Sequence, residues 1–189
     1  GGASPTPARA SGARHRDAAA SGTGTSTDNA WRASLTIKDV TVNEAAGRAT
    51  FTVSLNTASG QAVSVNYAMS NGTATAGADY TAASGTLNFA AGVTTQTITV
   101  SILDDAIFEG SENFNVTLSA PTDAIIADDT GVGTIRDDGT GAGGTDNDTP
   151  TLSVSNVTVT EGTNPFAVFS IGLSNASTTP GTGGPRLAD

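Results

Sequence analysis

The sequence contains no cysteine, a single histidine and very few aromatic residues. Without cysteine the chain can form neither disulfides nor thiolate zinc sites. The one histidine, His15, lies in a low-complexity stretch, so a histidine-based metal site or catalytic triad is not expected. Aromatic residues make up 5% of the chain, which leaves Val, Ile, Leu and a few Phe to build a core. Such a core suits a β-sandwich better than a large enzyme.

Positive charge is also scarce, and most of it lies near the N-terminus. Residues 1–48 hold six of the eight Lys and Arg residues, and between 49 and 185 Arg136 is the only one, against thirteen Asp and Glu. This balance argues against a nucleic-acid partner, because phosphates demand Lys and Arg. It is compatible with a cationic partner, of which Ca²⁺ is the simplest. No apolar run is long enough to span a bilayer. Because the chain starts at Gly1 and its only Met is Met69, we expect it to be a fragment of a longer protein.

Short segments between residues 34 and 136 alternate apolar and polar residues at a period of two, with Gly, Asn, Asp and Ser between them. Seven such segments and no helical pattern predict an all-β fold, an immunoglobulin-like seven-stranded antiparallel β-sandwich. A change of parity between Ile37 and Val40 predicts a bulge or a break in the first strand. The expected strands are 34–43, 48–56, 62–70, 85–90, 95–103, 112–119 and 131–136.

Composition divides the rest of the chain. Residues 1–32 are rich in Gly, Ala, Ser, Thr and Pro, which predicts a disordered low-complexity linker before the sandwich at 33–138. A Gly/Asp-rich linker is expected at 139–150, the start of a second repeat at 151–177, and a disordered tail at 178–189.

The second repeat is visible as TLSVSNVTVTEGTNPFAVFSIGLSNAS at 151–177, which aligns with SLTIKDVTVNEAAGRATFTVSLNTAS at the start of the sandwich. Leu35 matches Leu152, and with one inserted residue Leu55 matches Leu173. This is a tandem repeat with a period near 117 residues that stops after two strands. Two strands cannot bury a core alone. Either the chain belongs to a longer array of repeats, or the extra hairpin leans on the first domain.

Acidic residues continue the core-facing rows of several strands. Residues two apart on a strand face the same side, so Asp104 continues the row that ends at Ile102, and Glu112 precedes the row that begins at Phe114. If successive strands run alternately up and down, the connections that carry these residues share one end of the sandwich. The densest stretch is LDDAIFEGSENFNVTL at 103–118. The carboxylates expected at this pole are Glu44, Asp79, Asp104, Asp105, Glu109, Glu112, Asp137 and Asp138.

Like charges held together repel one another and raise one another's pKa. A hard divalent cation removes the conflict, and Ca²⁺ accepts roughly 6–8 oxygen ligands in flexible geometry, whereas Mg²⁺ prefers an octahedron and keeps its waters. The alternative is a solvated, repulsive surface that keeps the protein soluble. In the linker, GGTDND at 143–148 favours flexible chain, although its Asp146 and Asp148 could join an interdomain ion.

Four segments, VTVNEAAGRATFTVSL, GTATAGADYTAASGTLNFAAG, ITVSILDDAIFEGSENFNVTL and GVGTIRDD, together resemble the Calx-beta domain. This module is found in sodium–calcium exchangers, in an integrin subunit and in large bacterial surface proteins. The resemblance implies a Calx-beta sandwich whose pole binds Ca²⁺ through the eight carboxylates named above and the Ile107 backbone carbonyl. Ala106, Gly110, Ser111 and Gly139 replace acids of the exchanger pattern, which leaves the number and affinity of the sites open.

These inferences predict a non-enzymatic, Ca²⁺-binding, extracellular β-sandwich repeat module of a larger cell-surface or secreted protein. The expected partners are calcium ions, neighbouring repeats of the same chain and an unidentified adhesion partner. One alternative is a calcium-sensing regulatory module of a membrane protein. The other is a Ca²⁺-independent spacer attached to a secreted enzyme.

Overall fold

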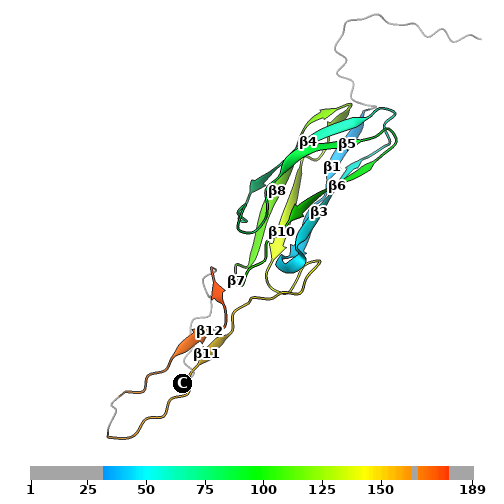
Figure 1. Cartoon of the computed structure of the whole chain (residues 1–189). Coiled ribbons are helices and arrows are strands. Elements are labelled where there is room, and N and C mark those ends of the chain that lie inside the picture. The colour runs from blue at the N-terminus through cyan, green and yellow to red at the C-terminus, as the bar shows by residue number, and fades with distance from the viewer. Residues whose placement is uncertain (1–31, 163–165, 179–189) are drawn as a thin grey trace, which may run out of the picture.

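The structure, a computed structural model, describes residues 32–162 and 166–178. Two β-sheets face one another around the core (Figure 1). One sheet has the strand order β6-β3-β1-β9, formed by β1 (Ala33–Ile37), β3 (Arg48–Leu55), β6 (Thr95–Ser101) and β9 (Ala124–Ile126). The other has the order β2-β10-β8-β4-β5, formed by β2 (Val40–Asn43), β4 (Val63–Asn71), β5 (Ser84–Phe89), β8 (Ser111–Thr122) and β10 (Thr130–Arg136).

The predicted β-sandwich is confirmed, and so is the break in its first strand. The chain leaves one sheet after Ile37 and enters the other at Val40, so β1 and β2 belong to different sheets. This switch makes two pairs parallel, β1 with β9 and β2 with β10, while the other pairs within the two sheets are antiparallel. Three short strands were not predicted, β9, β7 (Ile107–Phe108) and β13 (Ala176–Ser177), because two or three residues carry no readable alternation.

Alternation along the strands fills the core as the sequence predicts. Every second residue of β3 is buried, and the same holds for the apolar residues of β6 and the first half of β8. Three aromatic rings fill the centre: Phe114 lies edge-on to Phe51 at 5.8 Å between ring centroids and stacks on Tyr80 at 4.3 Å. Tyr80 comes from the connection between β4 and β5, where no strand pattern marks it as a core residue.

Glycine lines the core side of β10. The sequence pattern predicts Val132 and Ile135 as the apolar core residues of this strand. The buried row is instead Gly131, Gly133 and Ile135, and Val132 is only half-buried. A Cβ atom on Gly133 would lie 2.5 Å from the Phe114 ring. The ring of Phe114 therefore occupies the space that a side chain on this strand would need.

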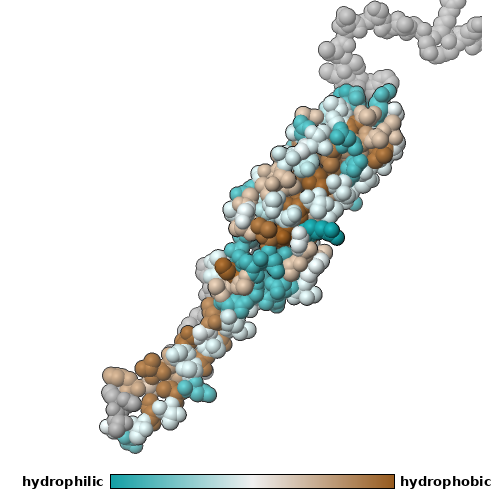
Figure 2. Space-filling view, in the orientation of Figure 1, coloured by the Kyte–Doolittle hydropathy of each residue, from teal (hydrophilic) through white to brown (hydrophobic). Residues whose placement is uncertain are grey.

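The start of the second repeat forms a hairpin beyond the sandwich, with β11 (Leu152–Val154) paired to β12 (Ile171–Leu173). Leu152 faces Leu173 here as Leu35 faces Leu55 in the sandwich, which is the pairing that the sequence alignment implies. The side chains that the first repeat buries are exposed in the second, and they form the brown surface at the lower end of Figure 2. A last short strand, β13 (Ala176–Ser177), pairs in parallel with β7.

Two other features concern the ends and the helices of the chain. The disorder predicted for residues 1–32 and 178–189 falls outside the described residues, apart from Arg32 and Thr178. The described ranges hold one short helix, the 3-10 turn η1 (Glu44–Ala46). No helix in them has the length and apolar character that crossing a membrane requires.

Candidate metal centre

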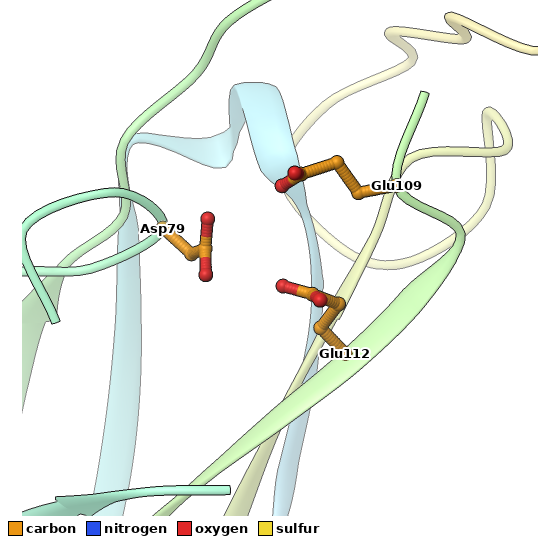
Figure 3. Close-up of side chains that lie close together, drawn as sticks. All are labelled: Asp79, Glu109 and Glu112. Carbon is orange, nitrogen blue, oxygen red and sulfur yellow. The ribbon is translucent and has the colours of Figure 1, made fainter. Parts of the chain in front are cut away.

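Three predicted carboxylates meet at one end of the sandwich. Asp79 comes from the β4–β5 connection, Glu109 from the connection between β7 and β8, and Glu112 from the start of β8. One carboxylate oxygen of each lies within 4.8 Å of the others. Figure 3 shows the three side chains pointing toward one another. Convergence of the β4–β5 and β6–β8 connections, predicted from strand direction, is thus observed. We call Asp79, Glu109 and Glu112 the inner cluster.

Tyr80 holds Asp79 in place. The Tyr80 ring is fully buried on Phe114, and its hydroxyl donates a hydrogen bond of 2.7 Å to Asn71 Oδ1. The neighbouring Asp79 side chain accepts a hydrogen bond of 2.6 Å from the Thr75 backbone amide through Oδ2. The Leu103 amide donates to the Asp79 carbonyl at 3.0 Å, which ties this connection to the end of β6. An aromatic anchor therefore fixes a carboxylate that is only 8% exposed.

A second group of carboxylates, which we call the linker cluster, consists of Asp137, Asp146 and Asp148, with one oxygen of each within 4.8 Å of the others. Asp137 follows β10 on the core-facing side, as parity predicts, and it is 2% exposed. Its two oxygens accept hydrogen bonds from the backbone amides of Glu109, at 3.1 Å, and Asp148, at 3.3 Å. Asp137 thereby connects the two clusters.

Burial and mutual repulsion raise the pKa values of several of these acids. Glu44, in η1, is 5% exposed, and its pKa rises to about 8, first because of burial and then because of the charges of Asp137 and Asp105. Burial and a hydrogen bond with Asp79 raise the pKa of Glu112 to about 7. Burial likewise raises the pKa of Glu109 and Asp137, partial desolvation raises that of the more exposed Asp104, and neighbouring carboxylates add to the shift of all three. The charges that act most strongly on these five groups are all those of other carboxylates.

Two predicted ligands, Asp104 and Asp105, lie at the rim of the site. Asp104 and Asp105 are exposed, because the chain leaves the sheet when β6 ends at Ser101. Asp105 Oδ1 accepts a hydrogen bond of 2.7 Å from the Ile107 backbone amide. This bond forms a local turn in the connection between β6 and β8, which we call the ligand loop. Neither cluster includes Glu44, Asp104 or Asp105, although the charges of Asp104 and Asp105 help to raise the pKa of Glu44.

Asp138 lies apart from both clusters. Its carboxylate is 3.8 Å from the Arg136 guanidinium, and it accepts hydrogen bonds from the amide and hydroxyl of Thr140. These hydrogen bonds, assisted by Arg136, lower the pKa of Asp138. Its side chain is 43% exposed. The ligand role that the resemblance implies for Asp138 stays a prediction.

Asn43 is a structural residue of the site that the sequence analysis did not identify. It is fully buried, and its Oδ1 accepts hydrogen bonds from the amides of Ala45, at 3.1 Å, and Asp146, at 3.3 Å. Its Nδ2 donates to the carbonyls of Arg136, at 3.3 Å, and Asp146, at 3.0 Å. Asn43 therefore has two roles: it caps η1, and it holds the linker that follows β10 against the sandwich. An Asn before Glu-Ala-Ala is a recognisable N-cap signal, but its contacts with the linker span about a hundred residues.

The donor set fits a hard divalent cation. Both clusters offer carboxylate oxygens only. The inner cluster draws them from the β4–β5 connection and from the region around the start of β8, and the linker cluster draws them from the connection that follows β10. Carboxylate-rich, flexible oxygen cages suit Ca²⁺, whereas Zn²⁺ and copper prefer nitrogen or sulfur donors. In Figure 2 the hydrophilic surface gathers where the sandwich meets the hairpin.

The fold and the site together define an immunoglobulin-like β-sandwich module with a carboxylate-rich pole. The chain belongs to the Calx-beta domain family, whose model matches residues 27–139, more than half of its length. The predicted family is confirmed.

Known proteins of two kinds are similar to this chain. Sodium/calcium exchanger 1 of Bos taurus is 43% identical over 70 residues, and that of Rattus norvegicus is 49% identical over 57 residues. These matches cover 37% and 30% of this chain but only 7% and 6% of the two exchangers. Among solved structures, the apo form of the Calx CBD1 domain matches this chain with a TM-score of 0.53 and 27% identity. The match covers 56% of this chain and 96% of that domain. The calcium binding domain CBD12 of CALX1.1 has a TM-score of 0.52 and 29% identity, with 55% of this chain covering 45% of it.

Proposed function

We propose that this chain is a non-enzymatic Ca²⁺-binding module of a larger protein. The observation that carries the proposal is the inner cluster: carboxylates from the β4–β5 connection, the β7–β8 connection and the start of β8 converge within 4.8 Å. The charges that act most strongly on Glu109 and Glu112 are those of other carboxylates. A bound Ca²⁺ would neutralise this repulsion. Asp79, Glu109 and Glu112 would hold the ion together with Asp137 and Glu44, and Asp104, Asp105 and the Ile107 carbonyl would close the rim.

Ion binding would also organise the junction with the next repeat. β7, which belongs to the ligand loop, pairs with β13, which follows the β11–β12 hairpin of the second repeat. The Thr178 amide also donates a hydrogen bond to the Phe108 carbonyl at 3.1 Å. Any ordering of the ligand loop therefore reaches the second repeat directly. The solved CBD12 structures, which are similar to this chain, support a tandem arrangement as the working unit. We propose neighbouring repeats as the partners and calcium-dependent rigidity as the role.

The cellular setting separates two forms of this function. We place the module in a cell-surface or secreted protein, where a site of millimolar affinity would be filled constantly and would serve rigidity or adhesion. The matches to sodium/calcium exchangers favour a second candidate, a regulatory calcium sensor of a membrane protein. A sensor needs a dissociation constant in the micromolar range. The affinity itself therefore discriminates between the two.

Calorimetric titration of the full chain with Ca²⁺ tests the proposal. We expect binding that Asp79→Asn weakens at least tenfold, because the amide keeps the shape and the Thr75 hydrogen bond but removes one charge. Asp128→Asn, in the turn before β10 at the opposite pole, is the matched control and should bind as the unmodified chain does. If Asp79→Asn and Asp128→Asn bind alike, the inner cluster is not the site. If the unmodified chain binds no Ca²⁺, the module is a spacer.

A further inference from the structure

The β11–β12 hairpin of the second repeat has the same pairing as β1 and β3 of the sandwich. The register of β11 with β12 corresponds to that of β1 with β3 at all three paired positions. The backbone hydrogen bond that follows corresponds as well. The Ser155 amide donates to the Ser170 carbonyl at 2.9 Å, as the Lys38 amide donates to the Thr52 carbonyl at 3.1 Å in the sandwich. The two faces of the hairpin are therefore equivalent to the two faces of β1 and β3.

One of these faces is apolar and uncovered. The five side chains that β1 and β3 turn toward the core are at most 5% exposed. Their counterparts in the second repeat are 56–65% exposed, and we call them the apolar face of the hairpin. They are Leu152, Val154, Phe169, Ile171 and Leu173. Among the described residues no second sheet lies over this face, which belongs to the brown surface at the lower end of Figure 2.

The opposite face of the hairpin carries small and polar residues that bond within the hairpin. Ser153 Oγ donates to the Gly172 carbonyl at 3.2 Å, and Ser155 Oγ accepts a hydrogen bond of 2.8 Å from the Ser170 amide. The hairpin is thus an amphipathic two-stranded sheet. Such a sheet is marginally stable by itself and becomes stable when another layer covers its apolar face.

The sandwich of the same chain does not supply that layer. The hairpin meets the sandwich at its base, where β13 pairs with β7 and Asn175 Nδ2 donates to Asp148 Oδ1 at 2.7 Å. From this base β11 and β12 extend away from the sandwich (Figure 1). The apolar face is therefore open to another molecule.

The size and charge of the hairpin fit a second copy of itself. Nine large apolar side chains between residues 152 and 173 are 36–78% exposed. Together they offer on the order of 900 Å² per chain, against roughly 800 Å² per partner in a standard protein interface. Glu161 is the only charged residue between 151 and 177, so two hairpins can approach one another with little repulsion. The acidic pole of each chain remains on the side of its own sandwich.

We propose that two copies of this chain associate through the apolar faces of their second hairpins. The two small sheets would pack face to face, and their side chains would interdigitate as those of the two inner faces of a sandwich do. Because each copy presents the same face, the contact is isologous and closes after two copies. This inference goes beyond the proposed function, since the contact requires no metal ion.

Sedimentation equilibrium of the full chain in EDTA, from micromolar to millimolar concentration, tests the proposal. We expect the mass to rise with concentration from that of one chain to that of two. Ile171→Asp, which places a charge on the apolar face, should weaken this association at least tenfold. Ser153→Asp, which places the same charge on the opposite face of the hairpin, is the matched control and should associate as the unmodified chain does. EDTA keeps the result independent of Ca²⁺ binding.

Thiol accessibility gives a second readout that adds no charge to the hairpin. The chain has no cysteine, so Val154→Cys and Ser153→Cys each place a single thiol on one of the two faces. Alkylation of the Val154→Cys variant should slow at least tenfold from the lowest to the highest concentration, and that of Ser153→Cys should stay constant. Equal slowing of both variants, or assemblies that grow beyond two copies, would contradict a face-to-face dimer. A chain that stays monomeric throughout would overturn the proposal, and if that monomer floats with phosphatidylcholine vesicles, the apolar face binds a membrane instead.

Discussion

Glu112→Gln should stabilise the protein without Ca²⁺ and weaken its response to Ca²⁺. Glu112 has an oxygen within 4.8 Å of oxygens of both Asp79 and Glu109. At that separation two unit charges repel by about 1 kcal/mol in water-like surroundings and by about 3 kcal/mol at an effective dielectric constant near 20. The pKa of Glu112 is about 7, so the full repulsion is present only above that pH. At pH 9 the glutamine removes it, and its amide can donate to the remaining carboxylates.

The expected gain without Ca²⁺ is therefore about 1–3 kcal/mol. For a domain of about 100 residues, 1 kcal/mol corresponds to roughly 4–8 °C in melting temperature. In a hundredfold excess of Ca²⁺ over its dissociation constant, the unmodified chain should gain about 2.7 kcal/mol. We expect the variant to keep less than half of that gain, because a neutral amide replaces a charged ligand.

Thermal melts at pH 9 in EDTA and in Ca²⁺ measure both effects. Asp128→Asn serves as the charge-matched control and should show neither. The reasoning is refuted if Glu112→Gln melts lower than the unmodified chain in EDTA and shows an undiminished increase with Ca²⁺. That result would mean that the inner cluster is neither strained by repulsion nor used for the ion.

Three further predictions concern protons, the aromatic anchor and the rim. Without Ca²⁺, Glu44 has a pKa raised from 4.5 to about 8, so its contribution to stability is present below pH 4.5 and lost as the pH rises through 8. As the pH rises through this window, Ca²⁺ should bind more tightly, and its binding should release protons. Calorimetry in buffers of different ionisation enthalpy would detect this release, and equal heats in all buffers would contradict it. Tyr80→Ala should lower the free energy of unfolding by about 3–5 kcal/mol and weaken Ca²⁺ binding. Tyr80→Phe loses only one hydrogen bond and should lower the free energy of unfolding, measured by urea denaturation, by about 1 kcal/mol. Similar losses for both variants would argue against the Tyr80 ring as the anchor of Asp79. Asp104→Ala/Asp105→Ala should remove most of the Ca²⁺-dependent stabilisation while leaving the EDTA melt unchanged or higher, and a full Ca²⁺ response in this variant would exclude the rim residues as ligands.

Local alternation predicts the parts of the site that directly follow regular strands. Asp137 lies two residues after the buried Ile135, and Glu44 two residues after Val42, and both are buried as that spacing requires. The same rule places Asp138 on the outer face, where it meets Arg136. Strand direction places Asp138 at the same pole and the family resemblance implies it as a ligand, and that role stays a prediction.

The remaining features depend on contacts between residues far apart in the sequence. Asp104 has the parity of a core-facing residue, but β6 ends before it, and the length of a strand is set by its neighbours. The return of the linker requires Asn43, which lies about a hundred residues earlier. Composition describes the linker as flexible chain because no local pattern encodes that contact.

The most direct test of Ca²⁺ binding at the acidic pole is a thermal melt of the full chain in EDTA, across a Ca²⁺ titration and across the same concentrations of Mg²⁺. We predict a melting temperature that rises with Ca²⁺ and reaches about 10–20 °C above the EDTA value at a hundredfold excess over the dissociation constant, with a smaller rise in Mg²⁺. A melting temperature that does not change up to several millimolar Ca²⁺, or that rises equally with Mg²⁺, would contradict a Ca²⁺ site and leave the pole as solvated surface.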